Sequence, residues 1–266
     1  LASLLLNNSI KAARNTSGVV GMLGSAIGLI AAVVSVFIGP AEMEIPIPLP
    51  FGSFALQMDI LSALLVGLIS LVGFAASLYS ISFLENSEHH NLGVLGFFIN
   101  IFIAAMILVV TTDNAFYFML FWELMTLASY FLVIFNTQDK EAVKAGFLYM
   151  FIAHIGGVLI MVSFFIFYLN TGDFTFGSFR QAELAPGVRN LIFLLAFIGF
   201  GAKAGIVPLH IWMPASYAAA PPHASALMSS VMKKTAIYGI LRICVDILGG
   251  SVLWWGLLLL FFGALS

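Results

Sequence analysis

Long apolar runs separated by short polar connections follow one another along almost the whole chain. Seven runs are long enough to cross a bilayer, at residues 18–38, 58–84, 92–112, 115–135, 145–169, 191–212 and 223–247, and a partial run follows at 251–266. Inside hydrocarbon, a single segment satisfies its backbone hydrogen bonds only as a helix. The connections hold turn-forming residues, including four prolines within 39–57. The pattern predicts an all-α fold, a polytopic membrane helix bundle.

The composition agrees with this pattern and excludes several classes of protein. Of the 266 residues, 62% are hydrophobic and 8% are charged, whereas soluble domains are about 45–50% apolar and about 25% charged. Ten basic and twelve acidic residues give a net charge of -2, so no basic surface for nucleic acid is expected. These values exclude a water-soluble globular protein, a disordered chain and a nucleic-acid-binding domain.

The sequence offers no recognisable site for a redox cofactor or a metal. The single cysteine, Cys244, supplies neither a disulfide framework nor the thiolate cluster of an iron–sulfur site. Histidines are not paired as haem ligands, and no G-x-G-x-x-G follows a strand-like segment. We therefore expect no cofactor and no metal, and any redox chemistry would belong to partner subunits.

The ends of the chain and its basic residues bear on how it lies in a membrane. Residues 1–6 are apolar but too short to span, and the last run stops at Ser266, so we expect a fragment of a longer protein. The basic residues of the connections divide four to two, with Lys11, Arg14, Lys140 and Lys144 on one side and Arg180 and Arg189 on the other. Because basic loops favour the cytoplasm, we place the Lys140 side there, in a multi-pass protein of the cell membrane.

A few ionisable residues lie inside the apolar runs, where a charge is costly and normally faces a partner or a cavity. They are Glu123, His154, Lys203, Lys233 and Lys234. Most have a structural alternative. Glu123 could serve only to neutralise a lysine, and His154 is better explained as a hydrogen-bonded packing residue than as a metal ligand. One of the two adjacent lysines could extend to the membrane surface.

Lys203 is harder to explain by packing, because it lies deep in its run among helix-breaking residues. It is flanked by Gly199, Gly201, Gly205 and Pro208. Pro208 removes the backbone hydrogen bond to the carbonyl of Ala204. A buried charge beside a broken helix recurs in ion pathways. We predict that the helix is interrupted between Gly205 and Pro214.

Helical spacing groups further polar residues on the run 223–247. His223 and Lys234 are eleven residues apart, close to three turns of an α-helix, and are predicted to share one face. Ser230 continues that face, whereas Lys233 points about 100° away. His223 and Lys234 are therefore candidate proton carriers beside a hydrated path. The alternative is that such polar side chains only hold helices together.

A carboxylate near a buried lysine provides a means to hold and release a proton. Glu123, Thr126 and Tyr130 form a polar stripe at i, i+3 and i+7. Burial makes a lysine release its proton more readily, and a nearby carboxylate makes it hold the proton. We predict that the side chains of Glu123 and Lys203 approach within direct or one-water contact, because an unpaired charge at this depth is too costly.

Several segments, taken in order, resemble one family of membrane proteins. They are DILSA at 59–63, WELMT at 122–126, NTQDK at 136–140, YMFIAHIG at 149–156, GFGAKAG at 199–205, KAGIVPLHIW at 203–212, PHASALMS at 222–229 and KTAIYG at 234–239. Together they are similar to the antiporter-like proton-translocating subunits, which include subunits L, M and N of NADH-quinone oxidoreductase and the Mrp antiporters. The likeness is greatest to the hydrogenase branch, which holds hydrogenase-4 component B and formate hydrogenlyase subunit 3.

The resemblance implies a division of the chain and roles for three residues. Members of the family have about fourteen spans with two inverted five-helix repeats. The division it implies is 1–91 for the end of helix 1 and helices 2–3, 92–247 for helices 4–8 of the first repeat, and 248–266 for the truncated start of the second repeat. Lys203 matches the lysine of the broken helix, Glu123 the glutamate of helix 5, and Lys234 the lysine of helix 8.

Two classes of function are open. The first is a proton-translocating subunit of a hydrogenase- or formate hydrogenlyase-type complex, whose partners would be other membrane subunits and a soluble redox arm. Near alternatives are a subunit of an NADH- or ferredoxin-quinone oxidoreductase, or of an Mrp-type antiporter that exchanges sodium ions for protons. The second class is a structural membrane anchor, in which the buried charges pair permanently.

Overall fold

The computed structural model describes residues 10–47, 51–83, 92–250 and 252–266. The helix end expected at residues 1–6 and the connection expected at 85–91 lie outside this description, as do the side chains of Lys11 and Arg14. Whether the Lys140 side faces the cytoplasm therefore stays a prediction.

Helices make up most of the described chain. The long ones are α2 (Ile10–Ile38), α3 (Ile60–Phe83), α4 (Leu92–Thr111), α5 (Ala115–Val133), α6 (Lys140–Thr171), α8 (Pro186–Ala204) and α12 (Leu253–Leu265). Short elements follow α6 and α8, namely α7 (Phe176–Arg180), the 3-10 turn η2 (Leu209–Trp212) and α9 (Met213–Ala219). A final helical run combines α10 (Pro222–Leu227), the π-helical η3 (Met228–Met232), α11 (Lys233–Ile240) and the π-helical η4 (Leu241–Ile247).

The predicted membrane helix bundle is confirmed. Within the described residues, six helices are long and apolar enough to cross a membrane, with α8 to α9 counted as one. They coincide with the first six predicted runs, and the seventh run, 223–247, is helical from α10 through η4. The partial run at 251–266 corresponds to α12, which is too short to be counted among the six.

One segment predicted as a proline-rich connection contains a β-hairpin. Strands β1 (Ala41–Ile45) and β2 (Phe54–Met58) pair antiparallel, with Ala41 opposite Met58 and Ile45 opposite Phe54. The prolines do not prevent this pairing, because Pro46 follows the last residue of β1 and so lies outside the ladder. The hairpin is the departure from an all-helical chain that we did not predict.

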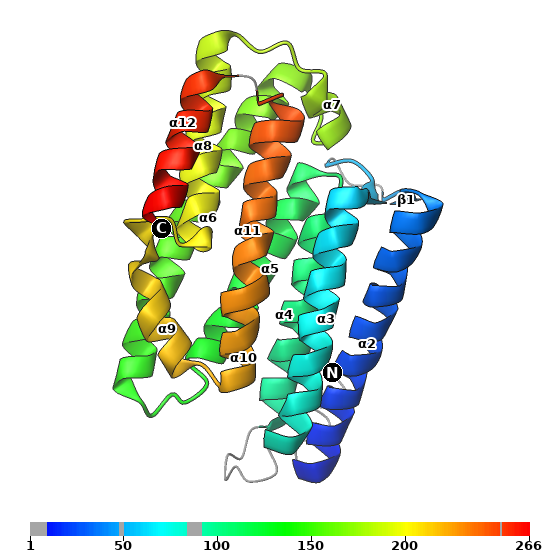
Figure 1. The fold of residues 1–266 in the computed structure, drawn as a ribbon, viewed down its shortest axis with the longest axis vertical. Helices are drawn as coiled ribbons and strands as arrows, with labels where there is room; N and C mark the ends of the chain where they lie inside the picture. Colours follow the sequence, from blue (N-terminus) through cyan, green and yellow to red (C-terminus); the bar gives the residue numbers. More distant parts are fainter. Residues whose placement is uncertain (1–9, 48–50, 84–91, 251) are drawn as a thin grey trace.

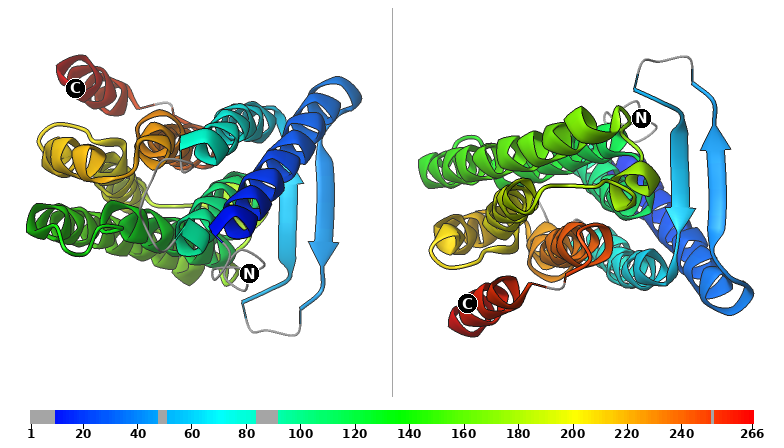
Figure 2. Two further views of the ribbon diagram at one scale, coloured as in Figure 1. Left: turned by 90° about the horizontal axis from the view of Figure 1, so that it is seen from below. Right: turned by 90° about the horizontal axis from the view of Figure 1, so that it is seen from above.

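The hairpin lies across one end of the bundle (Figures 1 and 2). The amide of Asp113, between α4 and α5, donates to the carbonyl oxygen of Ala55 in β2 at 3.0 Å. The amide of Phe176, at the start of α7, donates to the carbonyl oxygen of Asp113 at 3.1 Å. Backbone hydrogen bonds therefore join the hairpin, the α4–α5 connection and the α6–α7 connection at this end, which we call the hairpin end.

The helices form two groups with α5 and α11 between them (Figure 1). Helices α2, α3 and α4 pack against one another, and α6 packs against α8. Helix α5 contacts both α4 and α6, while α11 contacts α8, α4 and α3. The centre of the bundle is thus enclosed by α5, α6, α8 and α11.

Two glycines bring α6 and α8 into close contact. A Cβ atom placed on Gly156 would lie 2.7 Å from the carbonyl oxygen of Gly199, and a Cβ on Gly199 would lie 2.7 Å from the carbonyl oxygen of Gly156. Any larger side chain at either position would push the helices apart, as in other small-residue contacts between membrane helices. This contact places the C-terminal turn of α8 against the middle of α6.

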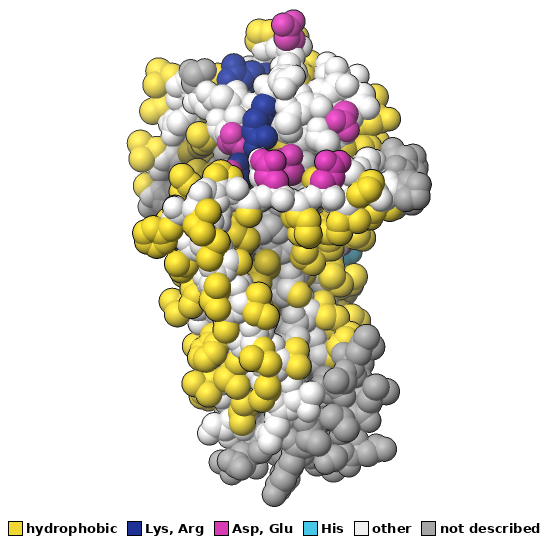
Figure 3. All heavy atoms as spheres, turned by 90° about the vertical axis from the view of Figure 1, so that its right-hand side faces the viewer, with side chains coloured by type: hydrophobic (Ala, Val, Ile, Leu, Met, Phe, Trp, Pro, Cys, Tyr) yellow, Lys and Arg dark blue, Asp and Glu magenta, His cyan; other side chains and the backbone are white. Residues whose placement is uncertain are grey.

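The surface of the molecule divides into an apolar body and a charged end. On the face seen in Figure 3, hydrophobic side chains cover most of the length, and acidic and basic side chains gather at the hairpin end. Large apolar side chains are exposed along the helices, including Phe37 at 84%, Phe147 at 71% and Leu169 at 78%. Such a surface fits a lipid environment and not water, so the chain is a multi-pass membrane protein.

Candidate functional site

Lys203 is the buried charge at the centre of the bundle. It is the penultimate residue of α8, and only 1% of its surface is exposed. Its ammonium nitrogen lies 5.4 Å from the ring centroid of Trp122 in α5 and 5.3 Å from that of Tyr149 in α6. It also donates a hydrogen bond to the hydroxyl of Thr126. Two aromatic rings and a hydroxyl thus take the place of the water shell that an ammonium group normally has.

Further hydroxyl groups line the same region. Thr126 donates its own hydroxyl hydrogen to a backbone carbonyl one turn earlier, at 2.8 Å, which leaves its oxygen free to accept from Lys203. The hydroxyls of Ser129 and Tyr149 lie 2.6 Å apart, and the Tyr149 hydroxyl is 3.8 Å from the sulfur of Met232 in η3. Polar atoms from α5 and α6 therefore extend from Lys203 toward the helical run that contains α11.

The helix that carries Lys203 ends directly after it, as predicted. Gly205 has a φ of +81°, a left-handed conformation that glycine adopts without strain, and it closes α8. The amide of Ile206 bonds to Gly201, so the carbonyl oxygen of Ala202 loses the donor it would have in a continuous helix. The indole N–H of Trp212 donates to that oxygen at 2.9 Å. The predicted interruption between Gly205 and Pro214 is confirmed, and it begins at Gly205, before Pro208.

Glu123 is not in direct contact with Lys203, so the direct form of the predicted pairing is wrong, and contact through one water molecule stays a prediction. Within the described residues, Lys203 has no ion pair with Glu123 within 4.0 Å and bonds to Thr126 instead. The reason is helix geometry. Trp122 and Thr126 are one turn apart and face Lys203, whereas Glu123 is turned by about 100° from Trp122. The charge of Glu123 acts on Lys203 only at longer range.

The ionisable group closest to Glu123 is His154 of α6, which the sequence reasoning left without a role. Glu123 Oε2 and His154 Nε2 are 3.7 Å apart, with side chains 34% and 49% exposed. Gly157 makes room for the carboxylate, since a Cβ there would lie 2.5 Å from Glu123 Oε1. A signal was present in the sequence, because Glu123 and His154 both lie in the middle of neighbouring predicted spans.

His223 and Lys234 do not share a face, contrary to the prediction. His223 is buried, 2% exposed, and its ring faces that of Tyr79 in α3, whereas Lys234 is exposed and Lys233 is half-buried. The π-helical segment η3 lies between them. A π turn holds more residues than an α turn, so eleven residues no longer make three turns and the face rotates.

A second group of charges, which the sequence reasoning did not identify, lies at the hairpin end. The guanidinium of Arg242 in η4 forms ion pairs with Asp59 at 2.7 Å and Asp246 at 2.9 Å. It also donates to the hydroxyls of Ser62 and Tyr238, both at 3.1 Å. Arg242 and Asp246 are opposite charges four residues apart within the apolar run 223–247, and this spacing could have revealed them.

The charges at the hairpin end influence the acidic residues that precede α3 and α5. Arg180 of α7 bonds to Asp246 at 2.9 Å and lies 3.9 Å from Asp113. Burial raises the pKa of Asp113, and the charges of Arg180 and Arg242 offset only part of that effect. Burial also acts to raise the pKa of Asp59, but its hydrogen bond with Arg242 and its other partners lower the pKa to about 2. Within this group of charges, the pKa of Asp59 is therefore lowered and that of Asp113 is raised.

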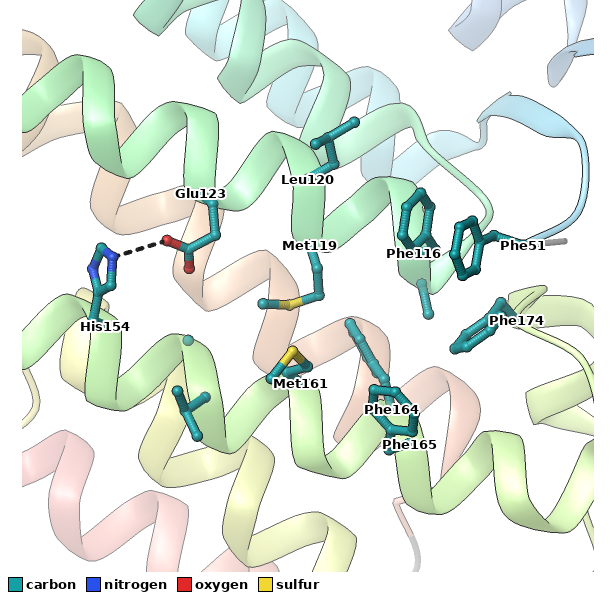
Figure 4. A pocket seen from close by; sticks show the side chains of 13 residues that line it. Phe51, Phe116, Met119, Leu120, Glu123, His154, Met161, Phe164, Phe165 and Phe174 are labelled. Atoms are coloured by element: carbon teal, nitrogen blue, oxygen red, sulfur yellow. Dashed lines mark ion pairs between the residues drawn. The ribbon is translucent and has the colours of Figure 1, made fainter. Parts of the chain in front are cut away.

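Glu123 and His154 also line a cavity of about 520 Å³ between α5 and α6. They lie at one end of it, and Phe51, Phe116 and Phe174 lie at the other (Figure 4). The other lining residues are apolar. In the part of the chain that the structure describes, no cluster of three His, Cys, Asp or Glu side chains could hold a metal ion, and the expectation that the chain binds no cofactor stays a prediction.

Comparison with known sequences gives consistent matches. Residues 112–266 match the family described as NADH:quinone oxidoreductase/Mrp antiporter, TM. The chain is 45% identical to hydrogenase-4 component B of Escherichia coli (strain K12) over 100% of its length, and 31% identical to formate hydrogenlyase subunit 3 of the same organism over 94%. In both cases the match covers 40% of the relative, so the chain spans less than half the length of these curated relatives.

Comparison with solved structures agrees on the fold. A chain in the structure of the Mrp complex from Dietzia sp. DQ12-45-1b superposes with a TM-score of 0.80 at 22% identity, over 96% of this chain and 49% of that one. The similarity shows that the helices are arranged in an antiporter-like fold.

Proposed function

The chain belongs to the NADH:quinone oxidoreductase/Mrp antiporter family, and we propose that it carries protons across the membrane within a redox-driven complex. The observation that carries this proposal is Lys203, a titratable side chain that is 1% exposed and lies next to a break in its helix. A buried lysine with aromatic and hydroxyl neighbours can exist with or without its proton. A lysine whose only task is packing would not need the broken helix beside it.

The roles of the other predicted residues follow from their positions. Glu123 acts on Lys203 through its charge, from the neighbouring face of α5. His223 is buried at the start of α10, at the end opposite the hairpin, and would carry protons within the helical run that also holds Lys234. Lys234, exposed on α11, would receive the proton from Lys203 and pass it outward. This order carries protons from the predicted cytoplasmic side to Lys203 and on to Lys234.

The division of the chain is part of the proposal. Residues 1–91 would hold the N-terminal helices, 92–247 the first proton-translocating repeat, and 248–266 the start of a second repeat. The segment 92–247 contains α4 to η4 and encloses Lys203. The match to the family begins at residue 112, after the end of α4 and just before α5.

The names of the relatives suggest which complex is involved. The most extensive match described above is to a component of hydrogenase-4, so we propose a hydrogenase- or formate hydrogenlyase-type complex. Other membrane subunits and a soluble redox arm would be the partners, and electron transfer in that arm would supply the energy. A quinone oxidoreductase or an Mrp-type antiporter is the second candidate, because the fold also matches the Mrp complex.

Ion transport by the complete complex tests the proposal. Inverted membrane vesicles that hold the complex should acidify inside when the electron donor is added. A protonophore should abolish the acidification, whereas a sodium ionophore should leave it unchanged. Electron transfer without acidification, in a complex that is fully assembled, would favour the structural anchor. Acidification that depends on sodium and is lost with the sodium ionophore would favour the antiporter.

A further inference from the structure

The contact between Glu123 and His154 has a feature that a fixed ion pair would not need. The two groups are 3.7 Å apart, longer than a hydrogen bond, and both are partly exposed to the cavity between α5 and α6. Glu123 projects from α5 beside His154 of α6, with its carboxylate directed to the imidazole (Figure 4). The carboxylate is therefore held loosely, at the edge of a cavity that could admit water at this polar end.

A second position for the carboxylate lies closer to Lys203. The indole N–H of Trp122 is buried and donates no hydrogen bond to any described group. It lies 4.0 Å from the point where a Cβ of residue 157 would stand, and Glu123 Oε1 lies 2.5 Å from the same point. A buried donor without an acceptor is costly. The space left by Gly157 thus adjoins both the carboxylate and an unused donor on the Lys203 side.

We propose that Glu123 is a two-position switch that His154 controls. With His154 protonated, the carboxylate stays outward and pairs with the imidazolium. With His154 neutral, the carboxylate turns inward, accepts from the Trp122 indole N–H and becomes the counter-ion of Lys203. This inference rests on the proposed function, because the switch has a task only if Lys203 carries protons.

The switch moves one proton in each cycle, and the charges balance. A proton from water at the cavity mouth binds to the neutral imidazole of His154, and Glu123 moves to it. Lys203 then lacks a counter-ion and releases one proton to a water molecule on the α11 side. The three groups carry no net charge before the uptake and none after the release. The proton on His154 next passes through the Glu123 carboxyl to Lys203, which restores the starting state.

The surroundings of Glu123 contain few other groups that could take over this role. The ionisable groups that Glu123 contacts or acts upon are His154 and Tyr149 from α6 and Lys203 from α8. Helix α4 also packs against α5 but has no ionisable residue, and α9 contributes only Tyr217. Tyrosine hydroxyls keep their protons at neutral pH. In this set, the imidazole of His154 is the group placed to accept a proton from water and pass it to the Glu123 carboxylate.

The test is the pH profile of proton uptake by the assembled complex in inverted vesicles, from pH 5 to 9, with uptake normalised to assembled subunit. His154→Gln keeps a polar side chain but cannot carry a proton, so uptake should fall about tenfold or more and should depend less on pH than in the parent. Trp122→Phe keeps a ring over Lys203 but removes the N–H, so uptake should fall while the parental pH dependence remains. Val158→Ala, in the wall of the same cavity, is the control and should behave as the parent.

A Lys203→Gln arm separates failure of the switch from failure of the proposed function. If His154→Gln keeps the parental rate and pH profile while Lys203→Gln stops uptake, the switch is wrong and the proposed function stands. If Lys203→Gln also keeps uptake, the proposed function is wrong. If the His154→Gln variant does not assemble, Gly157→Ala is the second test, because its methyl group fills the space beside the Glu123 carboxylate. Its uptake should fall relative to Gly24→Ala, a helical glycine with open space around it, and equal rates would overturn the switch.

Discussion

At the scale of single residues, the neighbours of Lys203 explain how a charge is tolerated in the core of the bundle. The ammonium group has the faces of Trp122 and Tyr149 and the hydroxyl of Thr126 around it, and it has no ion pair within 4.0 Å among the described residues. Aromatic rings and a single hydroxyl stabilise the protonated form less than a carboxylate in contact would. The proposed role of Lys203 as a proton carrier rests on this environment.

Thr126 gives a direct test of this environment. Thr126→Val keeps the shape of the side chain but removes the oxygen that accepts from Lys203, and a hydrogen bond to a charged group is worth about 1.5–3 kcal/mol. We expect proton uptake by the complex to fall about tenfold or more, with assembly unchanged. Thr126→Ser restores the hydroxyl and should recover most of the uptake. Equal uptake in the Val and Ser variants would show that this hydrogen bond has no part in proton transfer.

At the scale of elements, irregular helices decide where the charges point. Helix α8 closes at Gly205, two residues after Lys203. The carbonyl oxygen of Ala202, which lacks its helical donor there, accepts a hydrogen bond from the indole N–H of Trp212. The π-helical η3 turns Lys234 away from the face of His223. The second π-helical segment, η4, holds Arg242 between Asp59 and Asp246. Each irregularity sits next to an ionisable side chain, as is common at functional sites.

The ion pair that joins η4 to the start of α3 predicts a pH-dependent stability. In the folded state the pKa of Asp59 is about 2, below its ordinary value of 3.8. Its contribution is therefore complete above about pH 4 and is lost as the pH falls toward 2. Because Asp59 is one-third exposed, we discount the linkage value and expect Asp59→Asn to destabilise the protein by about 1–2 kcal/mol at pH 7.

The measurement is thermal unfolding of the purified complex in detergent at pH 7 and at low pH. Asparagine also caps helices well, so the substitution isolates the charge. The difference between Asp59→Asn and the parent should shrink as the pH drops from 4 toward 2. Glu141→Gln, which removes one partner of the exposed pair with Lys144, is the control and should change stability little at either pH. A difference for Asp59→Asn that is independent of pH would contradict the ion-pair account.

The sequence predicted the regular elements well and the irregular ones only in part. The length of a hydrophobic run predicts a span because an apolar segment inside lipid satisfies its backbone hydrogen bonds only as a helix. Gly205 and Pro208 mark the helix break that follows Lys203. The π turns have no such signature in the sequence, so the prediction that Lys234 shares a face with His223 was wrong. The partner of Glu123 depends on the rotation of α5 relative to α6 and α8, which is set by tertiary contacts such as that of Gly156 with Gly199. The hairpin was missed because its prolines are typical of loops.

At the scale of the whole molecule, the surface consists of an apolar body and one charged end. The apolar surface fits the bilayer, and the charges at the hairpin end fit one of its borders (Figure 3). Lys203 lies between the two ends and is only 1% exposed, and a charge at this depth normally faces a partner or a cavity. The chain spans about 40% of the length of these curated relatives.

The central claim, that Lys203 is a proton carrier, is tested most directly by replacing it in the assembled complex. Redox-driven proton uptake in vesicles is measured and normalised to assembled complex by immunoblot. Lys203→Ala removes the carrier, so uptake should fall far more than assembly, while electron transfer to an artificial acceptor persists. Lys203→Arg should not restore uptake, because arginine keeps its proton at any relevant pH. Uptake equal to the parent in the Ala variant, or full uptake in the Arg variant, would contradict the account.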